Sequence, residues 1–221
     1  MEYNKNYHLT LHENLYNSSR YHRMRSVISY YDYFHSSNEF FRDKKILEFG
    51  CGLGQNIFVL SQFGFDVTGY DVSKFAVDFC NKLGIKATTK FNSLKKFDVV
   101  FSKFVLEHVT NPYEELKKIR SKLNDNGLLI LVLAREKYRR VPLTPDVNRH
   151  LWTWNFQAIN NLLYETGYRV VKNEMRYDRG GFKKLMFIYN FIDSELLYSI
   201  ATKIVGIVTD SKEIRIYARK R

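Results

Sequence analysis

The sequence has few cysteines, few prolines and no long uninterrupted hydrophobic run. Only Cys51 and Cys80 occur among 221 residues, too few for a disulfide framework or a cysteine-rich metal site, which fits a reducing compartment. The N-terminal residues lack the apolar core of a secretory signal. The most apolar late stretch, Leu185 to Val208, contains three charged residues, so it does not resemble a membrane-spanning helix. We therefore expect a cytoplasmic protein.

Acidic residues are also in the minority. The chain carries 23 Asp and Glu against 35 Lys and Arg, a formal net charge of +12, while hydrophobic residues make up an ordinary 45%. This composition is that of a globular protein, and 3 prolines and 11 glycines exclude a linker-rich chain. A basic surface favours anionic partners such as phosphorylated small molecules, nucleic acid or an acidic bilayer, but charge alone does not choose among them.

Strand-like and helix-like segments alternate along the chain. Short apolar strands are expected at residues 45–49, 65–70, 85–91, 97–102, 128–134, 168–175 and 213–218. Helical patterns lie between them, with Ser73 and Asn111 as N-caps, and the helix after Asn111 extends to Asn126-Gly127. A further helix is expected to begin at Trp154 or Asn155. This order predicts an α/β, Rossmann-like, doubly wound fold with a seven-stranded, mostly parallel sheet covered on both faces.

Two segments lie outside this alternation. Residues 16–41 repeat apolar side chains at helical spacing, which predicts an N-terminal helical cap within residues 1–44. Residues 178–211 are too long for a loop between the last two strands, so we expect a helical insert there. The main domain is then expected at residues 45–221.

The strongest motif is the glycine turn after the first strand. Gly50, Gly52 and Gly54 alternate with other residues where the next helix begins, so that the backbone can approach a ligand closely. Asp71 ends the following strand, where its carboxylate can accept hydrogen bonds from a ribose. Gln55 breaks the dinucleotide fingerprint, which disfavours a nicotinamide cofactor.

These segments together resemble the class I S-adenosylmethionine-dependent methyltransferases. Residues 46–54, ILEFGCGLG, look like the first motif of that family, and residues 67–73, VTGYDVS, look like the segment ending in its ribose-binding acid. Residues 97–101, 106–109 and 111–112 are similar to the small-molecule branch that includes ubiquinone and menaquinone methyltransferases. The resemblance covers about residues 45–175 and is specific for fold and cofactor but not for substrate.

The resemblance implies a cofactor site for S-adenosylmethionine and no metal site. Asp71 would hold the ribose and Val72 would flank the adenine. Many relatives have an acidic residue that meets the adenine amino group; here Asn92, Ser93 or the backbone would take its place. Phe104 would close on the cofactor and the acceptor pocket. The methionine part would lie among Glu48, Gly50, Cys51, Gly52 and Gly54.

Methyl transfer to a hydroxyl benefits from a nearby base, and two histidines are candidates. His108 lies in a turn where it can instead hydrogen-bond the backbone, whereas His150 lies in the loop after the fifth strand, at the carboxyl edge where α/β proteins bind ligands. We favour His150. The same loop is rich in basic and aromatic side chains, which suits either a solvated face or an anionic or sugar-linked acceptor.

Three functions are compatible with these features. The first is a methyltransferase acting at O or N of a small-molecule or carbohydrate- or lipid-linked acceptor, with residues 182–208 either packing on the body or touching a membrane surface. The second is an RNA methyltransferase, favoured by the charge but lacking the Asn/Asp-Pro-Pro-Tyr/Phe motif of base-amino methylators. The third is a non-catalytic cofactor-fold binding protein, against which the intact Gly50, Gly52, Gly54 and Asp71 count.

Overall fold

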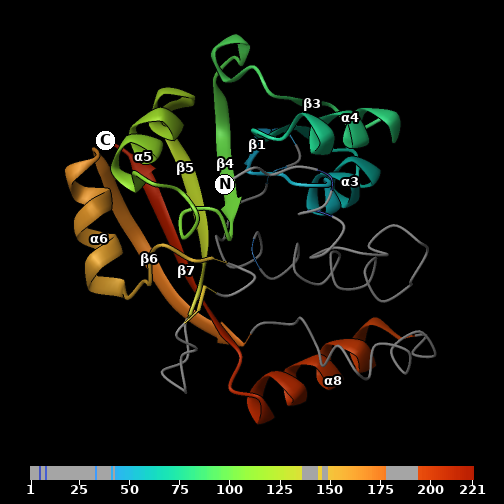
Figure 1. The fold of residues 1–221 in the computed structure, drawn as a ribbon, viewed down its shortest axis with the longest axis vertical. Coiled ribbons are helices and arrows are strands. Elements are labelled where there is room, and N and C mark those ends of the chain that lie inside the picture. The colour runs from blue at the N-terminus through green and yellow to red at the C-terminus, as the bar shows by residue number, and fades with distance from the viewer. Residues whose placement is uncertain are drawn as a thin grey trace. The chain divides into compact units, whose positions relative to one another are not determined.

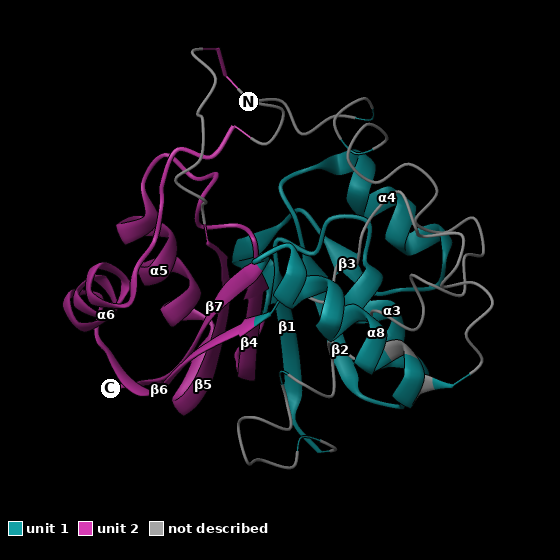
Figure 2. Cartoon of the chain, turned by 90° about the horizontal axis from the view of Figure 1, so that it is seen from below, with its two compact units in different colours: residues 1–94, 177–211 teal, residues 95–176, 212–221 magenta. Residues whose placement is uncertain are grey.

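The structure is a computed structural model that divides into two compact units. It describes residues 43–135, 144–145, 149–177 and 194–221, together with Lys5, His8, Tyr33 and Phe41. Unit 1 comprises residues 1–94 and 177–211, and unit 2 comprises residues 95–176 and 212–221 (Figure 2). Each unit is a layer of strands with its own helices, so each is described separately.

Unit 1 has the strand order β3-β2-β1. Its elements are β1 (Lys45–Phe49), α3 (Gln55–Gln62), β2 (Asp66–Tyr70), α4 (Lys74–Lys82), β3 (Ala87–Thr88), the 3-10 helix η1 (Phe91–Ser93) and α8 (Glu195–Val208) (Figure 1). β2 pairs in parallel with both β1 and β3. The last four residues of β1 and of β2 are buried, as expected for strands that are covered on both faces.

Unit 2 has the strand order β4-β5-β7-β6. Its elements are β4 (Phe97–Lys103), α5 (Pro112–Ser121), β5 (Leu123–Ala134), α6 (Phe156–Glu165), β6 (Tyr168–Tyr177) and β7 (Lys212–Lys220). β4 and β5 are parallel, while β7 is antiparallel to β5. The prediction of seven strands, with an antiparallel last strand, in a Rossmann-like α/β fold is therefore confirmed.

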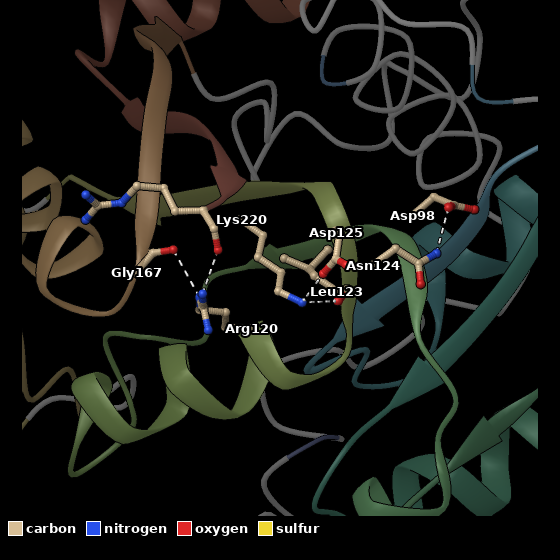
Figure 3. Close-up of polar contacts among 8 residues, drawn as sticks. Asp98, Arg120, Leu123, Asn124, Asp125, Gly167 and Lys220 are labelled. Atoms are coloured by element: carbon tan, nitrogen blue, oxygen red, sulfur yellow. Dashed lines mark hydrogen bonds and ion pairs between the residues drawn. The ribbon is translucent and has the colours of Figure 1, made fainter.

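Polar contacts fix the carboxyl end of the chain to α5 and the start of β5. The Arg120 guanidinium donates to the carbonyl oxygens of Gly167, at 3.0 Å, and Arg221, at 2.6 Å (Figure 3). The Lys220 ammonium lies 2.9 Å from the Asp125 carboxylate and 3.1 Å from the Leu123 carbonyl oxygen. The contacts of Arg221 and Lys220 join segments about a hundred residues apart in sequence.

Two predicted elements were wrong in length. The third strand was expected over residues 85–91 but comprises only Ala87–Thr88, because Phe91 turns into a 3-10 helix and packs its ring against Phe49 and Tyr70. The helix expected to reach residues 126–127 ends at Ser121. Leu123 is instead buried in β5 as the partner of Phe97 in β4.

The predicted cap and insert are described only in part. Of the helix expected at residues 16–41, the structure describes Tyr33 and Phe41, both buried; the rest of that helix lies outside the described residues. The insert contains α8, and residues 178–193 lie outside the described part. α8 buries Thr202 and Gly206 and exposes six aliphatic side chains: Leu196, Leu197, Ile200, Ile204, Ile207 and Val208.

Candidate active site

The glycine turn at the end of β1 is built on left-handed backbone. Gly50, Gly52 and Gly54 have φ angles of 78°, 50° and 81°, a region that side-chain-bearing residues rarely adopt. The N–H groups of Gly50 and Cys51 both donate to the Tyr70 carbonyl oxygen, at 2.8 and 3.0 Å. The turn is therefore tied to the end of β2, the strand beside β1.

Asp71 fixes the same turn from the other side. Its carboxylate accepts a hydrogen bond from the Gly52 N–H at 2.8 Å and one from the Ser73 N–H at 2.8 Å. The residue is only 8% exposed. An ionised carboxylate offers about four acceptor positions, so these two bonds leave acceptor capacity on both oxygens. Asp71 can thus hold the turn and still accept hydrogen bonds from a ligand.

The space over Gly52 is open. A Cβ atom built on Gly52 would have no atom within 4 Å, whereas one built on Gly54 would lie 2.7 Å from the Cys80 sulfur. Gly54 is therefore needed for close packing against α4, and Gly52 faces a space that a ligand can enter. Val72, which follows Asp71 in the chain, is 62% exposed. A carboxylate, an open glycine and an exposed apolar side chain match the ribose and adenine of an adenosyl cofactor, so these residues fit S-adenosylmethionine.

An aromatic cluster brings η1 to the same end of unit 1. The rings of Phe49, Tyr70 and Phe91 lie 5.0 to 5.9 Å apart, centroid to centroid. Asn92 and Ser93 follow Phe91 and are exposed. The Ser93 hydroxyl donates to the Lys90 carbonyl oxygen at 2.7 Å, which leaves its lone pairs as the acceptor for an amino group.

Polar contacts between neighbouring elements position the remaining turn residues. Glu48 is buried in β1, and its Oε1 accepts a hydrogen bond from the Asn56 amide at 2.6 Å. The Cys80 thiol donates to the Gly52 carbonyl oxygen at 3.5 Å. Contact with Cys80 and burial raise the pKa of the Cys51 thiol well above its ordinary value, which favours the neutral thiol over the thiolate.

His8 is a residue of unit 1 that the sequence analysis did not select. It is 3% exposed, and its ring lies 6.0 Å from the ring of Phe75 at the start of α4. Burial lowers the pKa of His8, and the nearby Asp71 carboxylate opposes that shift. A histidine in a polar N-terminal stretch carries no sequence pattern that predicts this long-range contact.

The predicted residues of unit 2 follow β4. Phe104 has a φ of 54°, unusual for a residue with a side chain, and its N–H donates to the Val132 carbonyl oxygen at 2.8 Å. The Lys103 ammonium lies 5.0 Å from the centre of the Phe104 ring. The structure thus holds Phe104 in a strained conformation at the carboxyl end of β4, and its contact with a cofactor stays a prediction.

The two candidate histidines contact each other. The His108 and His150 rings are 4.7 Å apart in a T-shaped arrangement. Glu107 joins the segment of His108 to the segment of His150, because its carbonyl oxygen accepts a hydrogen bond from the Leu151 N–H at 2.7 Å. Its buried carboxylate also accepts a hydrogen bond from the Ala134 N–H at the end of β5, at 3.0 Å. Two imidazoles from segments far apart in sequence therefore form one cluster.

Sequence comparison assigns a family to this arrangement. A family model described as a methyltransferase domain matches residues 16–173, more than half of the chain. The chain belongs to this methyltransferase family. The predicted family, enzyme class and S-adenosylmethionine cofactor are thereby confirmed at the level of the family.

Two curated relatives of this methyltransferase differ in acceptor. The mitochondrial ubiquinone biosynthesis O-methyltransferase of Schizosaccharomyces pombe is 33% identical over 104 residues, 41% of this chain and 38% of that protein. The tRNA U34 carboxymethyltransferase of Campylobacter jejuni is 28% identical over 155 residues, 64% of this chain and 50% of that protein. The chain thus spans about half or less of the length of these relatives.

Solved structures share the fold. The crystal structure of magnesium protoporphyrin IX methyltransferase from Synechocystis, with bound S-adenosylhomocysteine, has a TM-score of 0.59 and 16% identity. The match covers 92% of this chain and 85% of that chain. At 16% identity the structural similarity shows the fold but does not identify the methyl acceptor of this chain.

In this methyltransferase, unit 1 brings together Asp71, Val72 and the predicted cofactor residues of the glycine turn. Unit 2 brings together His108 and His150. Asn56, Glu107 and His8 also contact residues of the site from other elements, and no sequence pattern predicts them. Among the described residues, no group of acidic, cysteine or histidine side chains is arranged to hold a metal ion. No helix of the described part is long and apolar enough to cross a membrane, and the membrane contact of residues 182–208 stays a prediction.

Proposed function

We propose that this protein transfers a methyl group from S-adenosylmethionine to O or N of a small-molecule acceptor. The observation that carries the proposal is the Asp71 carboxylate, fixed by two backbone N–H groups beside the open space over Gly52. A carboxylate held in this way is pre-oriented, so it loses little conformational freedom when it binds the hydroxyls of a ribose.

Different residues of unit 1 bind different parts of the cofactor. Asp71 accepts hydrogen bonds from the ribose, and Val72 covers the adenine with its exposed side chain. Asn92 or Ser93 meets the adenine amino group, in place of an acidic residue. The methionine part lies along the glycine turn, near the buried Glu48 carboxylate, whose negative charge favours the cationic part of the cofactor.

The chemistry needs little from the protein beyond orientation. When bound, the cofactor supplies a sulfonium methyl group, which is already activated for displacement. The protein must hold the acceptor atom in line with that methyl group, about 3 Å away. For a hydroxyl acceptor, His150 takes the proton at an imidazole nitrogen, and His108 supports it through the edge-to-face ring contact.

Two observations support a small-molecule acceptor. The Schizosaccharomyces pombe relative is named for ubiquinone biosynthesis, and the Synechocystis structure is named for a porphyrin substrate. Anionic, sugar-linked and lipid-linked molecules are all compatible with the basic loop that includes Arg135 and Arg149. The exposed aliphatic face of α8 is compatible with a lipid-linked acceptor.

RNA is a second candidate acceptor, favoured by specific observations. The Campylobacter jejuni relative is named for a tRNA uridine and matches 64% of this chain, and the net charge of +12 attracts phosphates.

A methyl-transfer assay with radiolabelled S-adenosylmethionine tests both candidates. The purified protein is incubated with a metabolite extract and, separately, with total tRNA, and calorimetry measures cofactor binding. We expect label in the small-molecule fraction, reduced by Asp71→Asn and unchanged by Asp66→Asn at the exposed start of β2. Label confined to tRNA would make RNA the acceptor. Binding without transfer to either fraction would identify a non-catalytic binding protein.

A further inference from the structure

The 3-10 helix η1 is connected to Asp71 by a series of hydrogen bonds within unit 1. The Asp71 N–H donates to the Thr88 carbonyl oxygen at the end of β3, at 3.3 Å. The Thr88 hydroxyl accepts a hydrogen bond from the Lys90 N–H at 3.0 Å. The Lys90 carbonyl oxygen in turn accepts from the N–H and the hydroxyl of Ser93, at 3.2 and 2.7 Å. Because β3 runs parallel to β2, η1 follows the same end of the strands as Asp71.

The buried ring of Phe91 anchors η1 from below. It lies 5.9 Å from the Phe49 ring and 5.0 Å from the Tyr70 ring, centroid to centroid, and meets both rings edge-on. Asn92 and Ser93 follow Phe91 directly. Because aromatic packing and the hydrogen bonds to Lys90 already hold η1 in place, a ligand does not need to order this segment, which favours binding.

The segment that contains β3 and η1 has no acidic residue. Residues 85–94, IKATTKFNSL, include Lys86 and Lys90 but neither Asp nor Glu. An ionised carboxylate can only accept hydrogen bonds, whereas a side-chain amide has an acceptor oxygen and an NH2 group with two donors. Asn92 therefore has groups that can pair with an amino group or with a carbonyl oxygen on a base.

Two backbone N–H groups of this segment are already used inside η1. The Ser93 N–H donates to the Lys90 carbonyl oxygen, and the Leu94 N–H donates to the Phe91 carbonyl oxygen at 3.1 Å. A fixed N–H donor aimed at a ring nitrogen selects a base with a lone pair on that nitrogen and disfavours a base with a proton there. The Ser93 and Leu94 N–H groups do not impose this selection.

The exposure of Asn92 and Ser93 limits how strongly they can select a ligand. Both side chains are exposed. A protein rejects an analogue that lacks one hydrogen-bonding group by about ten-thousandfold where the loss leaves a buried polar group unpaired. An exposed amide or hydroxyl instead finds a water molecule, so the loss of a direct hydrogen bond costs little.

From these observations we infer that the purine of the cofactor binds to the surface formed by Val72 and η1, with Asn92 contacting position 6, and that this site accepts a 6-oxo purine as well as a 6-amino purine. This inference rests on the proposed function. It makes Asn92 the residue that sets the specificity for the base, and it adds inosyl analogues to the class of ligands that the cofactor site takes.

The chemistry of an amide matches both bases. In a 6-amino purine the amino group donates and the adjacent ring nitrogen accepts, so the Asn92 oxygen and NH2 group can pair with them respectively. In a 6-oxo purine the oxygen accepts and the ring nitrogen carries a proton, so the two roles are exchanged. A half-turn of the Asn92 amide exchanges its oxygen and its NH2 group in the same way and restores both hydrogen bonds.

Calorimetry with two ligands that differ only in the base tests this inference. S-adenosylhomocysteine and S-inosylhomocysteine, in which a carbonyl oxygen replaces the amino group of adenine, are titrated into the wild-type protein and two variants. Asn92→Asp replaces the amide by a group that only accepts hydrogen bonds. Gln62→Glu makes the same chemical change at the exposed end of α3 and is the matched control for the added negative charge.

We expect the dissociation constants of the wild-type protein for the two ligands to differ by less than about tenfold. Asn92→Asp should weaken S-inosylhomocysteine binding by about tenfold or more, because two acceptors then face each other, and should change S-adenosylhomocysteine binding by less than about threefold. Gln62→Glu should leave the ratio of the two dissociation constants unchanged. The melting temperature of each variant shows that it is folded.

Two results would overturn the inference. If S-inosylhomocysteine binds the wild-type protein more than about tenfold more weakly than S-adenosylhomocysteine, another group of the protein selects the amino group. If Asn92→Asp leaves the ratio of the two dissociation constants unchanged, Asn92 does not contact position 6. In both cases S-adenosylhomocysteine still binds and the proposed function stands, whereas a wild-type protein that binds neither ligand would refute the proposed function itself.

Discussion

Replacing Asp71 by asparagine tests two roles of its carboxylate separately: holding the glycine turn and binding the ribose of the cofactor. In the wild-type protein, the two oxygens of Asp71 accept hydrogen bonds from the N–H groups of Gly52 and Ser73, both at 2.8 Å. Asparagine keeps one acceptor oxygen and places an amide NH2 where the second oxygen was. One backbone N–H then faces another donor in a buried place, and the other loses its charged partner.

The expected magnitudes follow from these two bonds. A hydrogen bond to a charged group contributes about 1.5–3 kcal/mol, and a buried donor left without an acceptor costs about 1–3 kcal/mol. We therefore expect Asp71→Asn to lower the free energy of unfolding by about 2–4 kcal/mol. Loss of one ribose hydrogen bond should weaken S-adenosylhomocysteine binding by about tenfold to a hundredfold.

Urea denaturation measures the stability, and calorimetry under conditions where the variant is fully folded measures the affinity. Asp66→Asn is the matched control, because Asp66 begins β2, the strand that Asp71 follows, is exposed and carries the same type of side chain. Its effect on stability should stay within about 0.5 kcal/mol. Wild-type affinity for S-adenosylhomocysteine in a folded but destabilised Asp71→Asn protein would show that the carboxylate only holds the turn.

Four further variants test the packing around this site and in unit 2. Gly54→Ala places a Cβ 2.7 Å from the Cys80 sulfur at a φ of 81° and should lower the free energy of unfolding by about 2–4 kcal/mol; Gly64→Ala, at a φ of 78° with open space, should lose only about 1–2 kcal/mol. Tyr168→Phe removes a buried hydroxyl that donates to a carbonyl oxygen at 2.9 Å, so urea denaturation should show a loss of about 0.5–1.5 kcal/mol. His8 has a lowered pKa because it is buried, so the folded protein binds fewer protons than the unfolded chain just below about pH 6.5 and should lose stability there as the pH falls; the same pH-dependent loss in His8→Gln would refute this cause.

Local interactions could be predicted from the sequence. Ser73 and Asn111 were each expected as N-caps, and each side chain accepts a hydrogen bond from the N–H three residues later. A cap depends on one short polar side chain and the residues beside it, so the sequence contains nearly all the information. The alternation of strands with capped helices was sufficient to predict the Rossmann-like fold.

Long-range interactions could not be predicted. β5 begins at Leu123, whose backbone is in register with Phe97 on another strand, while the local sequence favours continuing the helix to Asn126. The contact between His8 and Phe75 and the contact between His108 and His150 depend likewise on how the chain folds back. The sequence selected both residues of the histidine pair as separate candidates but did not show that they touch.

The structural role of Asp71 changes what its presence implies about catalysis. A protein that had lost methyl transfer would still need this carboxylate to hold the turn through Gly52 and Ser73, so the intact motif alone does not distinguish an enzyme from a binding protein. The open space over Gly52 and the exposed Val72 have no such structural use, since an open turn and an exposed apolar side chain do not stabilise a fold. Filling the space over Gly52 is therefore a more specific test of ligand binding than replacing Asp71. Gly52→Ala, which meets no atom within 4 Å, should weaken S-adenosylhomocysteine binding more than the strain at its φ of 50° lowers stability, and equal affinity in this variant would argue that no ligand enters there.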